Sequence, residues 1–392
     1  MRRFLITTCL LAAIPLSGFG QAPDNTTKVK NFIKVWGLLK YYHPLVATGH
    51  IDWDAVFVNH FQKIIDAKNT NQFNSEIAAV INSVEKPSKV ESHESGDSLF
   101  AMNKVNINWI IHSNIFDKPV KDRLAYIYDN KNQEANKYIK MAYETTDFSG
   151  EKKYDSIGFP GVQYRLLFLS RFWNIINYFA PYKYLTTNWD DVLQRFIPKI
   201  MASNDTVLYY KTLLELCKSL NDGHSQLTLS GQTSATDVIF GKYTVPFYCE
   251  IIAGEVVIRN VPGDSISKSL NIQQGDIVLK INGEDIRQVM NDRKNYIPAS
   301  NHAGEMHELS KYILDGHIPA AKLDIQRAGR VIKTTITRIS TATRNWGAFI
   351  NYTSNDVGYR KLNDSVVLIY AMQIWNGNID TIKHLIKQVL TR

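Results

Sequence analysis

The sequence predicts a multidomain α+β protein, and three patterns along the chain indicate this organisation. An aromatic, helix-forming pattern occurs twice within the first 235 residues, short alternating strands begin near residue 236, and an apolar strand followed by a helical pattern lies between residues 366 and 390. The length of 392 residues is enough for about two to four domains. A content of 44% hydrophobic and 21% charged residues is that of an ordinary globular chain, neither disordered nor fibrous.

The first twenty residues have the pattern of a secretory signal peptide. Arg2 and Arg3 precede the apolar run FLITTCLLAAIPL, and the small residues SGFG follow it, which predicts cleavage near Gly20. The run is shorter than the ~20 apolar residues of a membrane-spanning helix, and no later stretch is long and apolar enough to cross a membrane. We therefore expect a secreted or periplasmic protein with no transmembrane segment; an N-terminal core helix is the alternative.

The charge of the chain bears on a nucleic-acid partner, and its cysteines bear on a zinc site or a disulfide. The formal net charge is +8, and removal of residues 1–20, which hold two arginines and no acid, would leave +6 (8 − 2). Because the positive residues are spread along the chain without dense blocks, we expect no nucleic-acid partner. Beyond the signal peptide only Cys217 and Cys249 remain, without a CxxC pair for a thiolate zinc site. They could form one disulfide, but Cys217 lies among leucines and a buried thiol is favoured.

Two segments of the helical part resemble each other. Residues 34–56 (KVWGLLKYYHPLVATGHIDWDAV) and 171–192 (RFWNIINYFAPYKYLTTNWDDV) each place a tryptophan eight residues before a proline, and a Trp-Asp pair follows the proline. Since proline disfavours helix at the residue before it, each copy predicts an aromatic amphipathic helix that ends at the proline. Asp52 or Asn188 could then cap the next helix. We expect two related helical units whose aromatic residues pack in a core.

A strand-rich stretch follows, with two turn signals around one strand. In GDIVLKINGEDI, Gly275-Asp276 makes a turn, the strand IVLKI follows, and Asn282-Gly283 is a tight-turn dipeptide. Together with the preceding VPGDSISKSLNIQQ, this pattern resembles a PDZ domain. The resemblance implies a PDZ-like β-barrel domain at residues 236–340 that binds extended peptides by strand addition, often at their C-termini, with the carboxylate-binding loop near YTVPFYCE. A generic small β-barrel is the alternative.

Directly upstream of this region, the helical pattern ends in the sequence LNDGHSQL. An Asp-x-His-(Ser/Thr) motif after a helical segment, followed by a PDZ domain and an α/β core, is the order of the tail-specific, or C-terminal processing, family of serine proteases. The chain resembles that family over about residues 165–375, and RFWNIINYFAPYKY followed by NDGHSQL is similar to secreted bacterial members with an extra N-terminal helical region. The resemblance implies a secreted serine-type peptidase that acts on unfolded or extended polypeptides and needs no cofactor.

His224 is the candidate general base of this motif. Imidazole suits the role because its unperturbed pKa of about 6.5 lies near working pH, and it would take the proton of a serine hydroxyl that cannot attack unaided. Tricorn-like relatives use such a histidine, whereas other members use a Ser-Lys dyad. The alternative is that His224 caps or braces the helix–loop junction, with Asp222, Gly223 and Ser225 as turn or bracing residues.

The resemblance also implies a catalytic serine in the α/β core, and we expect that serine to be absent from this chain. Residues 341–392 should hold only the first strand and helix of the core (SVVLIYAMQIW, then NIDTIKHLIKQVL), without a Ser-x-(Ala/Gly)-Glu-like context or a Gly-x-Ser-x-Gly elbow. Since a lone base cannot perform nucleophilic catalysis, we expect a truncated core and a chain that does not hydrolyse peptides.

No metal or cofactor site is expected. The cluster HAGEMHE at residues 302–308 is not His-Glu-x-x-His, and no Gly-rich phosphate-binding loop is present. Two functions remain open: a serine-type peptidase of the tail-specific family, and a non-catalytic, peptide-binding PDZ module of the cell envelope. The predicted segments are a signal peptide at 1–20, an N-terminal helical domain at 21–150, a helical segment with the Asp-Gly-His-Ser motif at 151–235, a PDZ-like domain at 236–340 and the start of a protease core at 341–392.

Overall fold

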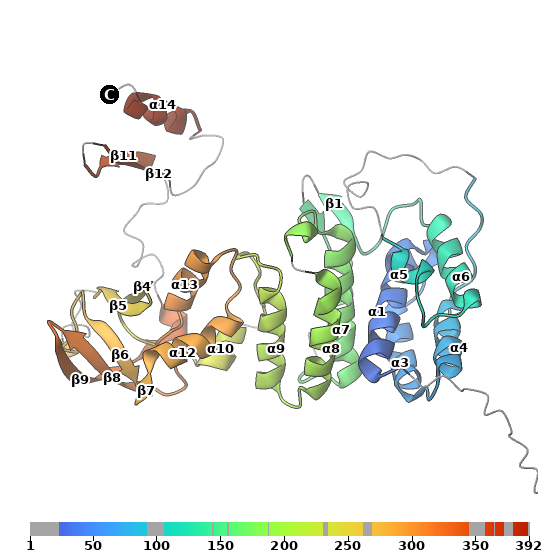
Figure 1. The fold of residues 1–392 in the computed structure, drawn as a ribbon, viewed down its shortest axis with the longest axis horizontal. Coiled ribbons are helices and arrows are strands. Elements are labelled where there is room, and N and C mark those ends of the chain that lie inside the picture. Colours follow the sequence, from blue (N-terminus) through green and yellow to red (C-terminus); the bar gives the residue numbers. More distant parts are fainter. Residues whose placement is uncertain are drawn as a thin grey trace, which may run out of the picture. The chain divides into compact units, whose positions relative to one another are not determined.

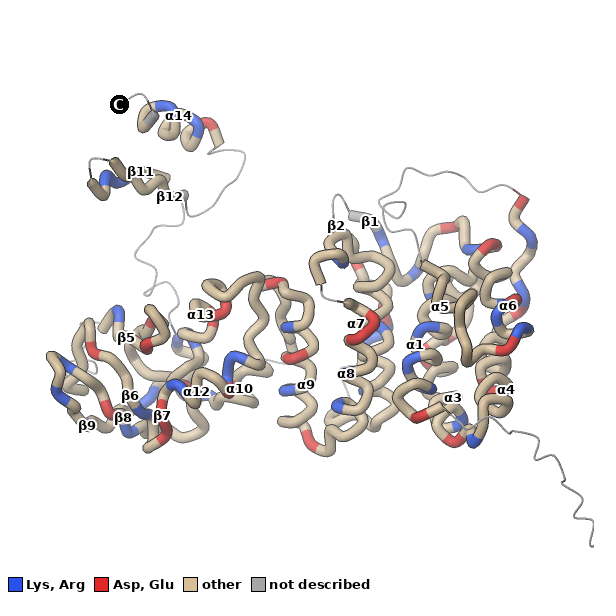
Figure 2. Tube along the Cα trace, viewed as in Figure 1, with Lys and Arg blue, Asp and Glu red and all other residues tan. Residues whose placement is uncertain are grey.

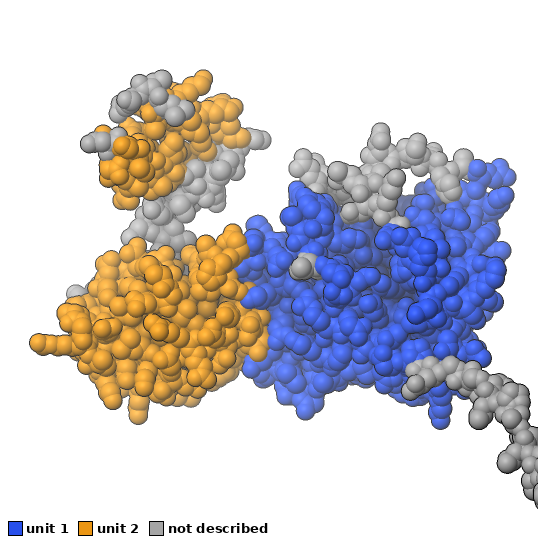
Figure 3. Space-filling model, in the orientation of Figure 1, with its two compact units in different colours: residues 1–232, 298–300 blue, residues 233–297, 301–392 orange. Residues whose placement is uncertain are grey.

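The chain divides into two compact units, described here from a computed structural model. The units are residues 1–232 with 298–300, and residues 233–297 with 301–392 (Figure 3). The structure describes residues 23–91, 106–142, 145–154, 157–186, 188–229, 234–261, 269–344, 357–363, 365–371 and 379–390. The predicted signal peptide lies outside these residues. Within them, no helix combines the length and the apolar character that crossing a membrane requires.

The first unit is built from helices, with one short antiparallel hairpin (Figure 1). Its apolar core is continuous across both predicted helical units and contains most of their tryptophan, phenylalanine and leucine side chains. The elements are α1 (Asn25–Tyr42), α2 (Pro44–Ala47), α3 (Trp53–Asp66), α4 (Thr70–Ile81), α5 (Asn108–Ile111), α6 (Lys118–Asp129), β1 (Lys140–Ala142), β2 (Thr145–Asp147), α7 (Val162–Phe179), the 3-10 helix η2 (Lys183–Leu185), α8 (Trp189–Ala202) and α9 (Thr206–Lys218).

The sequence repeat corresponds to a structural repeat, α1–α3–α4 and α7–α8–α9. In the first copy the Trp36 Nε1–H donates to the Trp53 carbonyl at 2.8 Å, and the Trp53 Nε1–H donates back to the Trp36 carbonyl at 2.9 Å. The second copy repeats the exchange between Trp173 and Trp189, at 2.9 and 3.0 Å. Each tryptophan therefore joins the long first helix of its copy to the next long helix while its ring fills the core.

Both predicted helix ends and one of the two predicted caps are present in the structure. The helices α1 and α7 both end before the proline that follows them, as predicted. Asp52 caps α3 by accepting the Ala55 N–H at 3.2 Å. Asn188 stands at the same place before α8, but the cap predicted there is wrong, because its side chain donates to the Asp191 carboxylate instead.

The long helices α1 and α7 approach each other closely at Gly37. A Cβ atom at this position would lie 2.0 Å from the Asn174 Cγ atom. The Asn174 side chain is buried and donates to the Ile33 carbonyl at 3.1 Å and to the Ser170 carbonyl at 2.8 Å. Glycine in the middle of a helix normally costs stability, so its presence here follows from the space that Asn174 occupies.

The second unit contains a six-stranded antiparallel sheet in the order β4-β5-β6-β8-β9, with β7 paired to β6. Its core combines one face of the sheet with residues of the helices, among them Val256, Leu309 and Leu323. The elements are α10 (Ala235–Phe240), β3 (Tyr243–Thr244), β4 (Tyr248–Ile252), β5 (Glu255–Asn260), β6 (Ile277–Ile281), β7 (Glu284–Asp285), α12 (Ile286–Arg293), η3 (Lys294–Tyr296), α13 (His302–Ser310), β8 (Ala320–Arg327), β9 (Arg330–Thr337), β10 (Ile339–Ser340) and η4 (Thr341–Thr343).

The predicted strand and helix after residue 341 are present, but the strand is not buried. Strand β12 (Val367–Ala371) pairs antiparallel with β11 (Val357–Lys361), and α14 (Ile379–Leu390) packs on this hairpin. Leu368 is 40% exposed, because a two-stranded sheet with one helix cannot cover both faces of an apolar strand. The apolar run of this strand indicates a strand buried in a sheet, and that interpretation is wrong for the described residues.

The burial of Cys217 agrees with the expectation from the sequence. Cys217 and Cys249 are both free and buried, so the buried thiol is confirmed for Cys217 and no disulfide joins the two. Burial raises the pKa of Cys217 to about 11, which keeps the thiol protonated and unreactive at neutral pH. Basic and acidic residues both occur throughout the described parts of the two units (Figure 2).

Candidate functional site

The candidate base lies in a tight turn that begins just after α9. Asn221 has a positive φ of 52°, which reverses the chain direction after the helix. The Asp222 carboxylate oxygen Oδ1 then accepts the His224 backbone N–H at 2.9 Å and lies 3.0 Å from the His224 Nδ1 atom. The Ser225 N–H closes the turn on the Asp222 carbonyl at 3.1 Å. The turn thus brings the four predicted residues together, as local sequence alone would require.

Asp222 sets the tautomer and orientation of His224. The His224 backbone N–H is the main cause that lowers the pKa of Asp222, so the carboxylate is ionised at neutral pH and can only accept. The hydrogen on the neutral imidazole is therefore on Nδ1, and Nε2 is left as the proton acceptor. A carboxylate on Nδ1 and an open Nε2 are the arrangement that orients a histidine base in serine hydrolases.

The His224 side chain projects into solvent. It is 98% exposed, and its hydrogen bond within the turn is to Asp222, so both the base and the bracing role remain open. No hydrogen bond joins His224 Nε2 to a serine or threonine hydroxyl in the part of the chain that the structure describes. The Gly223 N–H donates to Ser300 Oγ at 3.0 Å; Ser300 belongs to the short segment of residues 298–300 that clusters with the first unit.

The turn residues of the predicted PDZ signature have structural roles. Gly275 and Gly283 have φ values of 92° and 91°, and Asn282 has 51°, the left-handed region that glycine and asparagine tolerate. Asp276 is only 1% exposed, and Arg327 holds its carboxylate with two bonds of 2.7 Å. Burial would raise the pKa of Asp276, but the Arg327 guanidinium keeps that pKa below its usual value.

A second candidate site is the outer edge of β4. This strand is the last of its sheet, and its Ile251 N–H donates to Ser310 Oγ of α13 at 3.2 Å. The edge of β4 that no other described strand of this sheet covers therefore faces α13. Ser310 donates in turn to the Met306 carbonyl at 2.7 Å, which keeps its oxygen directed at the strand. The segment YTVPFYCE, near which the PDZ resemblance implies a carboxylate-binding loop, includes the beginning of β4, whereas α13 was not predicted as a neighbour of this strand.

A small cavity of about 20 Å³ lies at the beginning of β4. Thr244 and Lys311 line it, together with an ion pair in which Arg344 Nη2 lies 2.6 Å from both Asp315 carboxylate oxygens. Both side chains of the pair are 4% exposed. Burial raises the pKa of Asp315, and Arg344 works against that shift. Its volume is enough for about one water molecule or one carboxylate oxygen.

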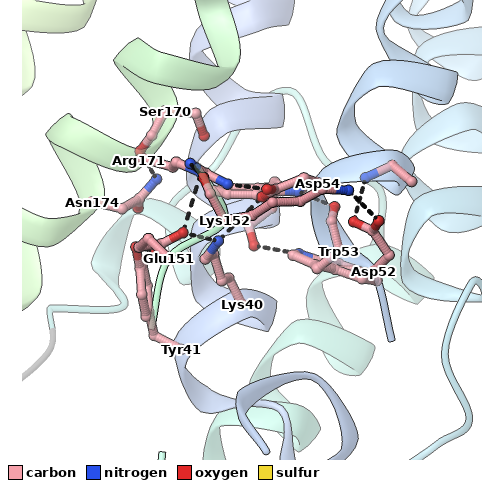
Figure 4. Close-up of polar contacts among 12 residues, drawn as sticks. Lys40, Tyr41, Asp52, Trp53, Asp54, Glu151, Lys152, Ser170, Arg171 and Asn174 are labelled. Atoms are coloured by element: carbon pink, nitrogen blue, oxygen red, sulfur yellow. Dashed lines mark hydrogen bonds and ion pairs between the residues drawn. The ribbon is translucent and has the colours of Figure 1, made fainter. Parts of the chain in front are cut away.

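A buried charged cluster in the first unit was not predicted (Figure 4). Lys40 lies 3.2 Å from the Asp54 carboxylate and 2.7 Å from the Glu151 carboxylate. Arg171 contacts both carboxylates as well, and the Tyr154 hydroxyl donates to Asp54 at 3.0 Å. Two cations face two carboxylates, so the cluster is neutral and its charges are paired with one another. It ties α1, α3 and α7 to the segment after β2, which is a structural role.

The repeat explains part of this cluster. Arg171 of the second copy pairs with Asp54 of the first, and Lys34, at the position of the first copy equivalent to Arg171, pairs with Asp190 of the second copy at 2.9 Å. The two copies therefore exchange equivalent ion pairs. The pair involving Asp54 is buried, whereas the Asp190 side chain is 51% exposed.

Among the described residues there is no group of three or more histidine, cysteine, aspartate or glutamate side chains that could hold a metal ion. In the cluster at residues 302–308, His302 Nδ1 lies 3.6 Å from Glu305 on the same face of α13, and its side chain is 83% exposed. This is an ordinary surface pair.

Comparison with protein-family models and with curated proteins gives no match. Among solved structures, mature CPAF, a chlamydial serine protease, matches with a TM-score of 0.34 and 15% sequence identity. The match covers 45% of this chain and 35% of that chain, so the chain spans about a third of the length of CPAF. A TM-score of this size does not establish a shared fold.

Proposed function

We propose that this chain is a secreted or periplasmic serine-type peptidase of the tail-specific family in which residues 236–340 form a PDZ-like unit that captures the end of an extended polypeptide. Because the sequence predicts no catalytic serine in this chain, we expect it to bind peptides without hydrolysing them. His224 is the candidate general base of the reaction that the family resemblance implies. The observation that carries the proposal is the outer edge of β4, which presents backbone groups beside α13. The resemblance of LNDGHSQL to the family motif supports the family and the role of His224, and the signal-peptide pattern of residues 1–20 supports the secreted or periplasmic location.

The edge of β4 has what strand addition requires. An incoming peptide would hydrogen-bond to the outer backbone groups of Tyr248–Ile252 and lie between this strand and α13. Ser310 now accepts the Ile251 N–H, so a peptide would have to replace that bond with one from its own backbone carbonyl. The exchange is nearly neutral in energy, because one hydrogen bond replaces another.

The small cavity at the beginning of β4 suits the terminal carboxylate. It opens between the first residues of the strand and the end of α13, which places it at one end of the proposed peptide groove. Its lining holds the cations Lys311 and Arg344, the carboxylate of Asp315 and the hydroxyl of Thr244. Arg344 is paired with Asp315 and Lys311 with Glu308, so a peptide carboxylate would have to compete with these two side chains. A carboxylate bound there would accept charge-assisted hydrogen bonds, which are stronger than neutral ones.

Peptide binding is tested by fluorescence anisotropy with labelled ten-residue unstructured peptides ending in a free carboxylate or in an amide. We expect saturable binding of the free acid and at least tenfold weaker binding of the amide. Ser310→Ala should tighten binding of the free acid by several-fold, since the Ile251 N–H then needs no release, while Thr335→Ala on the exposed side of β9 should leave it unchanged. Absence of saturable binding would reject the PDZ-like role.

Cleavage is tested separately with an unfolded protein substrate and a serine-directed inhibitor. Because no catalytic serine is expected in this chain, we expect no inhibitor-sensitive cleavage by it. Cleavage that falls by several orders of magnitude in His224→Ala, with peptide affinity unchanged, would contradict this expectation and assign the base. A non-catalytic peptide-binding module is the second candidate, and it is favoured by the lack of a hydroxyl bonded to His224 Nε2 within the described residues. Saturable binding without cleavage would support the peptide-binding role.

A further inference from the structure

The turn that follows α7 presents a group of exposed apolar side chains. Tyr182, Tyr184 and Leu185 are 65%, 76% and 64% exposed, more than any other large apolar side chain among the described residues. The two tyrosine rings are in edge-to-face contact, with their centroids 6.3 Å apart. Single exposed apolar side chains are common on protein surfaces, whereas three within four residues indicate an interaction site.

The equivalent turn in the first copy of the repeat is covered by the protein itself. Counted from the proline of each copy, Ala47 corresponds to Tyr184, and Ala47 is 0% exposed. The Lys137 N–H donates to the Ala47 carbonyl at 2.8 Å, so a later segment of the chain packs on that turn. Within the part of the chain that the structure describes, no segment covers Tyr184 in this way. The same turn is therefore buried in one copy and a free surface in the other.

Hydrogen bonds within the exposed turn satisfy its backbone. The Leu185 N–H donates to the Tyr182 carbonyl at 2.9 Å. The Thr186 N–H donates to the Lys183 carbonyl at 3.0 Å, and Pro181 has no N–H. An unsatisfied backbone group is costly in an apolar medium. Because this turn bonds its own N–H groups, it can enter such a medium at little cost.

The charge of the turn is held against the end of α7. Lys183 is the only charged residue between positions 181 and 186 of the sequence. Its ammonium donates to the Asn177 carbonyl at 2.7 Å and to Asn177 Oδ1 at 3.1 Å. The exposed side chains of the turn are thus uncharged, and two of the three are tyrosines. Tyrosine prefers the layer between lipid headgroups and acyl chains, where its ring has apolar surroundings and its hydroxyl stays hydrated.

A lipid surface fits this turn better than a second protein does. A stable protein interface buries about 800 Å² on each partner and involves about 20–30 residues a side. Asn188 and Asp190, at the beginning of α8, are exposed and polar, so the apolar group does not continue into that helix. Three side chains on one turn are too few for a protein interface, but they are enough for shallow insertion between lipid headgroups.

We propose that the turn of residues 181–185 inserts reversibly into the interfacial layer of a lipid bilayer and holds the protein weakly at a membrane surface. The insertion buries the three apolar side chains that the fold leaves exposed, and it requires no membrane-spanning helix. The membrane contact is independent of the proposed peptidase and of the peptide groove.

The test is sedimentation with phosphatidylcholine vesicles, at lipid concentrations up to about 10 mM because a single small anchor binds weakly. The protein is residues 21–392, since the apolar run of the predicted signal peptide would itself bind lipid. We expect a bound fraction that rises with lipid and is no smaller in about 0.5 M than in about 0.1 M NaCl, because apolar insertion is not screened by salt. No binding at the highest lipid concentration, or binding that salt abolishes, would overturn the proposal.

Variants locate the contact. The double variant Tyr184→Ser/Leu185→Ser should need at least tenfold more lipid for the same bound fraction, because it removes two of the three inserting side chains. Leu45→Ser in the equivalent turn of the first copy and Val331→Ser on β9 also remove exposed apolar side chains, and both should bind as the wild type does. Equal binding by the double variant and the wild type would reject the site.

Two further measurements separate lipid from protein as the occupant. Tyr184→Trp places a fluorophore on the turn, and its emission should shift to shorter wavelength when vesicles are added; an unshifted emission means that the turn stays in water and rejects insertion. Sedimentation velocity without lipid should show no self-association that depends on the turn. Self-association that Tyr184→Ser/Leu185→Ser abolishes would assign the turn to a second copy of the chain and overturn the proposal.

Discussion

Replacing Asp54 by alanine should destabilise the first unit strongly, because it leaves the buried cluster with an excess positive charge. Asp54 accepts from Lys40, Arg171 and Tyr154, and its side chain is only 5% exposed. After the substitution, two cations face the single carboxylate of Glu151. The Lys40 side chain is 1% exposed, so water cannot replace the lost partner.

The size of the effect follows from this burial. Breaking a buried ion pair by removing one partner costs about 3–5 kcal/mol. Burial already lowers the pKa of Lys40, and Glu151 and Asp54 oppose that shift, so loss of Asp54 makes the neutral amine easier to form. Removing the proton from an amine of ordinary pKa costs about 4.6 kcal/mol at pH 7. Since Lys40 can become neutral in this way, the loss of stability cannot exceed about that cost. We therefore expect Asp54→Ala to lower the free energy of unfolding by about 3–4 kcal/mol at pH 7.

The repeat supplies a matched control, Asp190→Ala. Asp190 occupies the equivalent position in the second copy and pairs with Lys34 at 2.9 Å, but its side chain is 51% exposed. Water reaches the pair from the side of Asp190, although the Lys34 side chain is only 6% exposed, and the Lys34 ammonium also lies 5.5 Å from the centroid of the Trp173 ring. We expect a loss of about 1 kcal/mol or less.

Both variants are measured by urea unfolding followed by tryptophan fluorescence. Five of the seven tryptophans lie in residues 1–232, so the signal reports mainly on the first unit. At pH 9 the loss for Asp54→Ala should shrink, because releasing the Lys40 proton becomes about 2.7 kcal/mol easier. Equal losses in the two variants, or a larger loss for Asp190→Ala, would refute the argument that burial decides the energy.

Three further predictions concern His43, Gly37 and His224. The pKa of His43 is lowered from 6.5 to about 4, so its contribution to stability is complete above pH 6.5 and is lost as the pH falls toward 4. This loss amounts to about 3 kcal/mol, and the slope of unfolding free energy against pH should flatten in His43→Ala; parallel curves would contradict it. Gly37→Ala, which usually stabilises a helix, should instead destabilise by about 1–3 kcal/mol in urea unfolding, because the new methyl group must displace the Asn174 side chain. His224→Ala should leave the melting temperature almost unchanged, whereas Asp222→Ala, which removes the acceptor of the turn, should lower it measurably; a large loss in His224→Ala would support the bracing role.

Local signals in the sequence were sufficient for several elements. Proline ends α1 and α7, and Asp52 caps α3, because these effects act within a few residues. The Asn282-Gly283 turn and the Asp222–His224 turn are equally local, and both have the expected form. For the same reason, the four residues of the candidate base turn could be placed together without any knowledge of the fold.

Features that depend on distant segments were not predictable in this way. Lys40 and Glu151 are separated by 111 positions, and nothing near either residue indicates that it is buried with the other. The position of α13 beside β4 likewise depends on how the chain between η3 and β8 folds back on the sheet. Even a local feature such as the cap at Asn188 was not predictable. Its side chain could either accept a backbone N–H of α8 or donate to a nearby carboxylate, and in the structure it donates to Asp191.

The repeat shows how one helical arrangement came to present different chemistry in its two copies. In each copy a paired-tryptophan contact joins the first two long helices, and a third helix ends in a loop. In the first copy this loop is residues 84–87, and its Glu85 carbonyl holds His43 at the wall of an apolar cavity. In the second copy the corresponding residues, 220–223, lead into the exposed His224 turn, and Ala180 replaces His43. The two copies therefore differ in where they hold a histidine: the first has His43 buried beneath its loop, and the second has His224 exposed on the loop itself. Because equivalent tryptophan contacts hold the helices of both copies, the same helical arrangement accommodates both placements.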